Sequence, residues 1–184
     1  MEIKASMFHQ DWKDIPKGNN ISKAVKTYKE AKSFYASIDE TIEEDTIVYE
    51  VYSCPRMEEA GSLGWGLTIL HPLLVQGECN MTRGHFHEKI DREEYYWCMQ
   101  GEGLLMLMDE AGTCWCEEVK EGSLHHIQGK IAHRLINTGN KDLMVTACWP
   151  GDSGHNYAAI EGKPFPYRVF KIEEQLVIKE RDYE

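Results

Sequence analysis

The stretch Thr82–Gln100, TRGHFHEKIDREEYYWCMQ, carries the pattern on which both the architecture and the chemistry of this 184-residue chain depend. His85 and His87 are two residues apart, and on an extended chain this spacing directs both imidazoles to one face. Glu94 opens the next run, which is rich in aromatic residues and typical of a β-strand. The stretch therefore predicts two imidazoles on one face, followed by a strand that begins with a carboxylate.

Short runs with a period of two surround this stretch, from Thr46 onward. Turn signals separate them at Asp109–Gly112, at Glu121–Gly122 and at Asn137–Asn140. Many short strands with few helical stretches predict an all-β sandwich or barrel, so we assign residues 46–184 to one barrel domain. The predicted strands are Ile47–Tyr52, Trp65–Leu70, Glu94–Met99, Leu104–Met108, Cys114–Val119, His133–Asn137, Leu143–Trp149 and Arg168–Ile172.

Residues 1–45 have a different pattern and are predicted to form an N-terminal extension with one helix. Ser22 is a candidate cap for the segment Lys23–Tyr35. Its apolar residues recur at a helical spacing, with lysines on the opposite face. We expect this helix to pack over the barrel, the lysines to be solvated, and the acidic run Asp39–Asp45 to serve as a connector.

Composition excludes several classes of protein. Twenty Lys and Arg residues against 31 Asp and Glu residues give a net charge of −11, which argues against a nucleic-acid-binding face and against a polybasic membrane patch. An anionic ligand must therefore be held by local donors. No apolar run approaches the roughly 20 residues that span a bilayer, and the N-terminus lacks a signal-peptide core. We expect a cytoplasmic protein.

Six cysteines occur without any C-x-x-C pair, so a zinc ribbon or a thioredoxin-like motif is not indicated. We interpret all six as reduced, small apolar side chains.

A later strand supplies His133, four residues before Asn137. Three imidazoles and one carboxylate that converge inside a barrel form a ligand set for a divalent transition metal, with positions left open for catalysis. The candidate ligands are His85, His87, Glu94 and His133. The donor set is compatible with one Fe(II), Mn(II), Zn(II) or Ni(II) ion per chain. Four other histidines lack such a context, and we interpret them as structural or exposed: His9, His71, His125 and His126.

The order His85-x-His87…Glu94-x6-Gly101, followed by Gly122…His133-x3-Asn137, resembles the two cupin motifs. The second motif usually has Pro where this chain has Gln128 and Gly where it has Lys130. The long gap between His87 and Glu94 is similar to that of a narrower group, the archaeal-type (cupin) phosphoglucose isomerases. Further matches run from about residue 46 to about 180 and include Val48–Tyr52, Thr82–Gly84, Ala132–Arg134 and Pro150–Tyr157.

This resemblance implies a jelly-roll barrel, a homodimer, and a metal-dependent interconversion of glucose 6-phosphate and fructose 6-phosphate. The metal ligands implied are the four residues named above, with Fe(II) the expected ion. The resemblance also places Thr68, Thr82, Gly84 and Tyr157 at the sugar phosphate, and Tyr96 and His155 near the sugar. One departure is Trp149, where family members can carry Tyr; indole donates a hydrogen bond but cannot accept one.

The chemistry of an aldose–ketose isomerase agrees with these residue types. Moving hydrogen between C1 and C2 builds negative charge on both oxygens, which a divalent metal stabilises. Glu94 is the candidate base, while Tyr96 and His155 are candidates for passing protons or opening the ring. Arg83 is a further candidate donor to the phosphate. Two alternatives remain open: an Fe(II) oxygenase on the same barrel, and a non-catalytic sugar-binding cupin.

Overall fold

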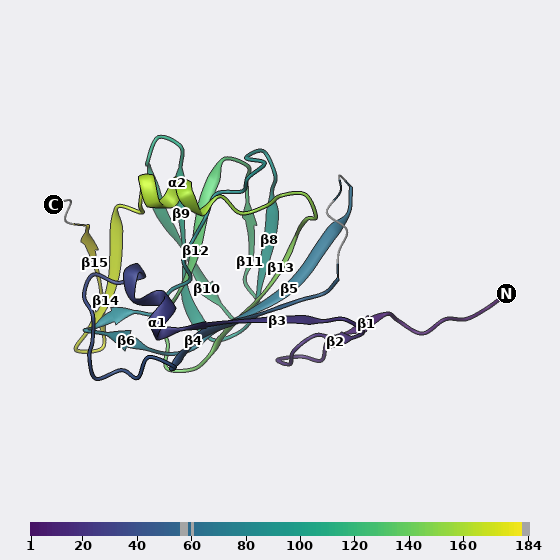
Figure 1. Ribbon diagram of the computed structural model, residues 1–184, viewed down its shortest axis with the longest axis horizontal. Helices are drawn as coiled ribbons and strands as arrows, with labels where there is room; N and C mark the ends of the chain where they lie inside the picture. Colours follow the sequence, from purple (N-terminus) through teal and green to yellow (C-terminus); the bar gives the residue numbers. More distant parts are fainter. Residues whose placement is uncertain (56–58, 60, 182–184) are drawn as a thin grey trace.

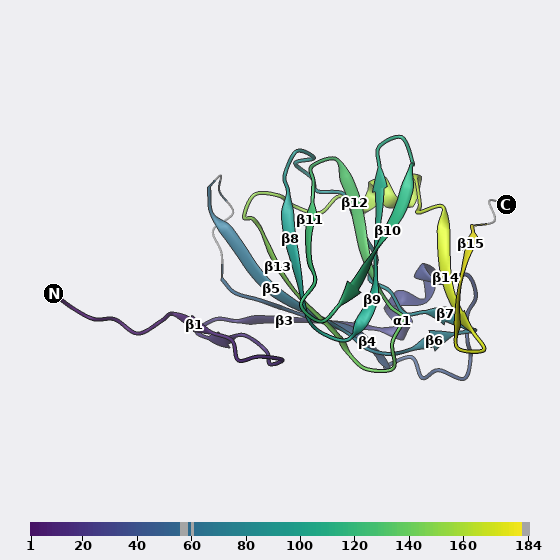
Figure 2. The same ribbon diagram turned by 180° about the vertical axis from the view of Figure 1, so that it is seen from behind.

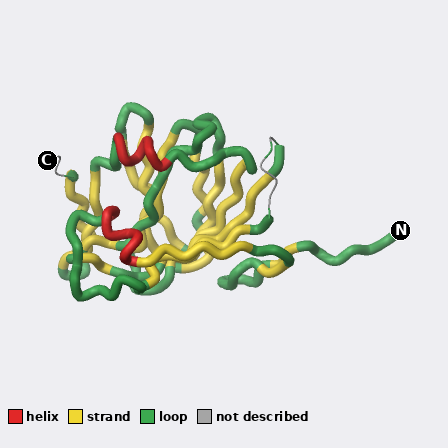
Figure 3. Tube along the Cα trace, in the orientation of Figure 1, coloured by secondary structure: helices red, strands yellow, loops and turns green. Residues whose placement is uncertain are grey.

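The computed structural model describes residues 1–55, 59 and 61–181, and β-strands account for most of its regular structure (Figure 3). The last three residues of the predicted barrel domain lie outside this range. The described residues form two helices, α1 (Tyr28–Ala31) and α2 (Tyr157–Gly162), and a 3₁₀ turn, Lys32–Phe34, follows α1. The strands are β1 (Phe8–His9), β2 (Lys17–Gly18), β3 (Ser22–Thr27), β4 (Ile47–Ser53), β5 (Leu63–Leu70), β6 (Leu74–Val75), β7 (Glu78–Cys79), β8 (Glu94–Gln100), β9 (Glu102–Asp109), β10 (Cys114–Lys120), β11 (Leu124–Ile127), β12 (Ile131–Asn137), β13 (Leu143–Pro150), β14 (Tyr167–Ile172) and β15 (Gln175–Glu180).

Two antiparallel sheets form the barrel (Figures 1 and 2). One has six strands in the order β11-β8-β13-β5-β4-β3, and the other has three in the order β10-β9-β12. Their inner faces enclose an apolar core to which β8, β9, β12 and β13 contribute. The predicted all-β jelly-roll class is confirmed, and each predicted strand falls within an observed one.

A second layer covers the outer face of β9 and β12. The four-stranded sheet β15-β14-β7-β6 and the two helices pack there around a second apolar core. Alternation along β9 divides its side chains between the cores, because Leu105 and Leu107 face the barrel interior while Met106 and Met108 face the outer layer. The same alternation on β12 sends neighbouring side chains to different layers, which matters for the cavities described below.

The predicted helix over Lys23–Tyr35 is wrong for its first half. Residues Ser22–Thr27 form β3, which pairs antiparallel with β4 at the edge of the six-stranded sheet. The helix begins only at Tyr28. Thr27 is its N-cap residue, and the backbone N–H of Thr27 donates a 3.0 Å hydrogen bond to the carboxylate of Glu30. The unpaired edge of β4 provides a complete set of backbone partners, and this pairing outweighs the helical spacing of the apolar residues.

All six cysteines are free thiols. Burial raises the pKa of Cys79, Cys98 and Cys114 to about 11, which keeps these thiols protonated and unreactive near neutral pH. Neither helix in the described part of the chain is long and apolar enough to cross a membrane.

Candidate metal centre and substrate pocket

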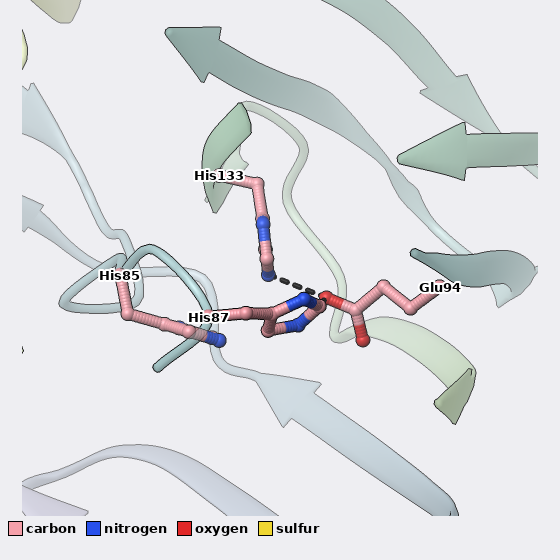
Figure 4. A group of neighbouring side chains, drawn as sticks. All are labelled: His85, His87, Glu94 and His133. Atoms are coloured by element: carbon pink, nitrogen blue, oxygen red, sulfur yellow. Dashed lines mark ion pairs between the residues drawn. The ribbon is translucent and has the colours of Figure 1, made fainter. Parts of the chain in front are cut away.

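The side chains of the predicted ligands point toward one another (Figure 4). His85 and His87 lie on the segment before β8, Glu94 is the first residue of β8, and His133 lies on β12. His85 and His133 exchange two backbone hydrogen bonds of 3.3 and 3.1 Å, which fix the two segments side by side. The four candidate ligand atoms all lie within 4.8 Å of one another.

The carboxylate of Glu94 lies between two of the imidazoles. Its Oε1 atom is 2.5 Å from Nε2 of His133 and 3.3 Å from Nε2 of His87. Burial by itself would raise the pKa of Glu94, but the His133 and His87 imidazoles outweigh it and hold this pKa below its ordinary value. The carboxylate is therefore ionised and available as a ligand.

Hydrogen bonds on the far side of two rings set their tautomers. Nδ1 of His87 donates to the Arg92 carbonyl at 2.7 Å, and Nδ1 of His133 donates to the Ile131 carbonyl at 3.3 Å. Because Nδ1 of each ring is taken up by a carbonyl, Nε2 is the ring atom that is left to face a cation. Burial and the neighbouring His133 and His155 rings lower the pKa of His85 well below its ordinary value, so this ring is neutral.

Three atoms of the cluster are buried and make no hydrogen bond within the described residues: Nε2 of His85, Nε2 of His133 and Oε1 of Glu94. Buried polar atoms without partners are costly, and a bound cation satisfies all three at once. Three imidazoles and one carboxylate fit a divalent transition metal. The residues present therefore match the ion that the sequence predicted.

A cavity of about 360 Å³ opens beside the cluster. Three of the four candidate ligands line it: His85, Glu94 and His133. The structure brings to the same cavity the other residues singled out in the sequence: Thr68, Thr82, Arg83, Gly84, Tyr96, Trp149, His155 and Tyr157. The roles given to these residues stay predictions.

The cavity contains side chains that keep a proton and can donate it. Burial, then the nearby Glu94 carboxylate, raises the pKa of Tyr96 well above its ordinary value, so the phenol keeps its proton. The Oγ1 atom of Thr82 accepts a 3.0 Å hydrogen bond from the N–H of Leu135, which leaves its own proton to donate. Gly84 has a φ of +78°, and a Cβ at this position would lie 2.7 Å from the ring of Phe165.

The loop after β13 brings His155 to the cavity. His155 is exposed, and its ring lies 4.3 Å from the His85 ring, centroid to centroid. Asp152 holds this loop in place, because its carboxylate accepts hydrogen bonds from Nε and Nη2 of Arg92 at 2.9 and 2.8 Å and from Nζ of Lys89 at 2.7 Å. The segments that carry His87 and His155 are thereby fastened together.

The cavity residues that sequence reasoning missed include Lys26 and Tyr49. Lys26 lies on β3 and was assigned to the solvated face of a helix, so the error in secondary structure concealed it. Tyr49 lies on β4, and burial raises the pKa of its phenol. The interpretation of His125 as structural agrees with its contacts, since its two nitrogens bond Ser123 Oγ at 2.8 Å and Glu117 Oε2 at 2.6 Å, outside the cavity.

An antiparallel barrel that encloses a His-x-His, Glu and His cluster able to hold a metal ion defines a cupin-type protein. The family model described as glucose-6-phosphate isomerase matches residues 21–183. The chain belongs to the glucose-6-phosphate isomerase family, as the resemblance predicted.

Curated relatives support this assignment. The chain is 36% identical over 167 residues to the glucose-6-phosphate isomerase of Thermococcus litoralis, covering 88% of this chain and 87% of the relative. It is 37% identical over 136 residues to that of Pyrococcus horikoshii, covering 74% and 71%. Among solved structures, an oxalate oxidase in complex with glycolate aligns with a TM-score of 0.46 at 12% identity, covering 78% of this chain and 58% of that one. A TM-score this low adds nothing to the assignment.

Proposed function

We propose that the protein is a metal-dependent aldose–ketose isomerase that interconverts glucose 6-phosphate and fructose 6-phosphate. One observation carries the proposal: a cluster suited to a divalent metal opens into the same cavity as a protonated phenol, a solvent-accessible histidine and several hydroxyl donors. The membership of the chain in the glucose-6-phosphate isomerase family supports the substrate class.

His85, His87, Glu94 and His133 would hold the metal. When bound, the metal supplies an electrophile that stabilises negative charge developing on the C1 and C2 oxygens of the sugar. Glu94 is ionised, so its carboxylate accepts the proton that leaves C1 or C2 and returns it to the other carbon.

Tyr96 and His155 handle protons at the sugar oxygens. The raised pKa of Tyr96 makes the phenol a donor at these oxygens and keeps it from acting as a base. His155 lies at the exposed side of the cavity and exchanges protons with solvent, which suits it to opening the sugar ring.

The phosphate end of the substrate needs donors, because the chain as a whole carries a net charge of −11. Thr68 and Thr82 offer hydroxyl protons, and the Gly84 N–H allows a close backbone contact. Tyr157 and Arg83 complete this end; the Arg83 guanidinium lies 4.5 Å from the centre of the Tyr157 ring. Trp149 also lines the cavity, but its indole Nε1 is buried and lies against Gly64, so the ring does not replace the hydroxyl that a tyrosine would offer.

Three finer assignments belong to the same proposal. Fe(II) is the ion we favour, with Mn(II), Zn(II) and Ni(II) as the other candidates. A homodimer in the cytoplasm is expected, with the exposed apolar side chains of the N-terminal segment available to a second subunit.

The test is a coupled assay of fructose 6-phosphate conversion on EDTA-stripped protein, with Fe(II), Mn(II), Zn(II), Ni(II) or no metal added back. We expect turnover to disappear on stripping and to return with at least one metal. Absence of turnover with every metal, while one ion binds per chain, would contradict the substrate and direct the search to other sugar phosphates. Oxygen uptake measured in parallel tests the oxygenase alternative.

A further inference from the structure

A second cavity, of about 440 Å³, lies on the other side of the barrel wall, between the outer face of β12 and the segment from α2 to β14. Its volume falls in the range of about 300–1,000 Å³ that small-molecule sites occupy. The lining residues are Lys26, Glu30, Ser33, Phe34, Arg83, Arg134, Ile160, Glu161, Pro164, Phe165 and Arg181. Four are cationic and two are anionic, so the lining is positive although the chain is strongly negative.

Arg134 is the central feature of this cavity. It follows the metal-ligand candidate His133 on β12 and faces the opposite way, and only 6% of its surface is exposed. Its Nη2 atom donates to the Tyr167 carbonyl at 2.9 Å and contacts the Met106 sulfur at 3.3 Å. The guanidinium also lies 4.6 Å from the centre of the Phe165 ring.

The charge of Arg134 is not matched by a carboxylate. Its Nε atom is buried without a hydrogen-bond partner, and among the described residues no Asp or Glu lies within ion-pair distance. The acid with the strongest favourable charge interaction with Arg134 is Glu78, which is buried. Its Oε1 atom already pairs with Nη1 of Arg168 at 2.8 Å. A buried cation without a counter-ion is costly, so a group that supplies negative charge at this point would be strongly favoured.

The other acids of the cavity are already engaged. Glu161 pairs with Arg83, and Glu30 pairs with Lys26 at 3.4 Å. Among the described residues, the positive charge of this lining that has no ion pair is that of Arg134, and Arg181 lines the same cavity. Guanidinium groups favour planar, bidentate hydrogen bonds to phosphate oxygens.

The wall between the two cavities is thin but distinct. Gly84 forms part of it, with Phe165 and the Cβ of Arg134 immediately behind its Cα. Lys26 and Arg83 reach both cavities, whereas Arg134 and Arg181 line only the outer one. Arg134 and Arg181 are therefore residues of the outer cavity that the isomerase chemistry does not use.

We propose that the outer cavity is a second anion site, which binds the phosphate group of a small phosphorylated molecule through Arg134 and Arg181. The volume exceeds what a phosphate group alone fills, so a phosphate ester is the expected occupant and not the free ion. This site goes beyond the proposed isomerase activity and does not depend on it.

The test is isothermal titration of the metal-loaded protein with inorganic phosphate and with glycerol 3-phosphate. Wild-type protein should bind two glycerol 3-phosphate molecules per chain, with phosphate binding more weakly in the outer cavity. Arg181→Gln should weaken one of the two sites about tenfold, as expected for the loss of a charged hydrogen-bond donor, and leave turnover unchanged. Thr68→Val should weaken the other site. Equal binding of phosphate and the ester in the outer cavity would overturn the ester assignment.

Lys179→Gln is the matched control, because it removes one positive charge from the same region without lining either cavity. It should leave both sites unchanged. Arg134→Gln, checked for folding by circular dichroism, should weaken the same site as Arg181→Gln. Crystals soaked in selenate should show an anomalous peak beside Arg134. A single site that responds to Thr68→Val alone, or selenate found only in the inner cavity, would overturn the proposal.

Discussion

Trp149 lies directly opposite Gly64 in the pairing of β13 with β5, and its indole covers the backbone where a side chain at Gly64 would begin. A Cβ on Gly64 would lie 2.6 Å from Nε1 of the indole and 2.8 Å from Cζ2. The three atoms closest to that position all belong to Trp149. The glycine therefore gives the indole its place at the edge of the substrate pocket.

We predict that Gly64→Ala pushes the indole into the pocket. The added methyl group overpacks the site, which should lower the free energy of unfolding by about 1–3 kcal/mol. The KM for hexose phosphate should rise, because the displaced indole takes up space in the cavity that Trp149 lines. Urea unfolding and steady-state kinetics measure the two effects.

In a Trp149→Ala background, Gly64→Ala should lower the free energy of unfolding by less than about 0.5 kcal/mol, because the indole that the added methyl group would meet is absent. Gly162→Ala is the control, because no atom lies within 4 Å of a Cβ at that position. An equal loss of stability in both backgrounds would show that the indole does not depend on Gly64.

His133→Ala should abolish both metal binding and turnover while the barrel stays folded. The ring supplies one candidate ligand atom and an ion pair of 2.5 Å to Glu94. Changes to residues that only support the ligands typically lower metal affinity or activity by roughly 10–100-fold. Loss of the His133 ring should lower both by more than that. Metal analysis after dialysis, kinetics and circular dichroism test this; His126→Ala, on the outer surface, is the control. Full turnover in a metal-free His133→Ala protein would contradict the metal centre.

The strands of the barrel could be predicted because apolar and polar residues alternate along them. In the N-terminal segment the spacing of apolar residues misled the prediction. Val25, Tyr28, Ala31 and Tyr35 fit a helical spacing, yet the chain is extended up to Thr27. The deciding factor is the free edge of β4, which lies more than 20 residues further along the chain. Local spacing cannot report a partner so distant.

The candidate metal ligands were accessible from the sequence because spacing along single strands sets them on one face. The role of Arg134 was not accessible in this way, although the residue belongs to the segment Ala132–Arg134 that matches the family. Alternation along a strand predicts only that Arg134 faces away from His133. An arginine on a solvent-exposed outer face would show the same pattern. Its burial results from the second layer, where Phe165 and β14 pack over β12. That layer has no signature in the sequence around Arg134.

Lys130 adopts a left-handed conformation, with a φ of +68°, at the position where the cupin motif usually has Gly. A side chain with a Cβ is strained in this region of backbone space. We predict that Lys130→Gly raises the free energy of unfolding by about 1 kcal/mol, because the exposed ion pair lost with Asp91 contributes little. Gln128→Gly, exposed and outside the left-handed region, should instead destabilise the protein. A loss of stability in Lys130→Gly would contradict the strain.

Asp152 should make a contribution to stability that depends on pH. Its hydrogen bonds with Arg92 and Lys89 hold the pKa of its carboxyl below the ordinary value of 3.8. A lowered carboxyl pKa stabilises the folded state above the unfolded pKa, and this stabilisation is lost as pH falls through the folded pKa. The difference in urea midpoint between wild-type protein and Asp152→Asn should therefore be constant from about pH 5 to pH 8 and should shrink below about pH 4. EDTA-treated protein keeps metal release out of the comparison.

Asp45→Asn removes the same charge from an exposed position and serves as the control for that profile. Its urea midpoint should follow wild type at every pH, because an exposed carboxylate contributes little. Asp152→Asn should also lower turnover at pH 7, since the carboxylate fastens the loop that carries His155 to the segment that carries His87. If Asp152→Asn matched wild type in both stability and turnover, the ion-pair cluster would not be what positions His155.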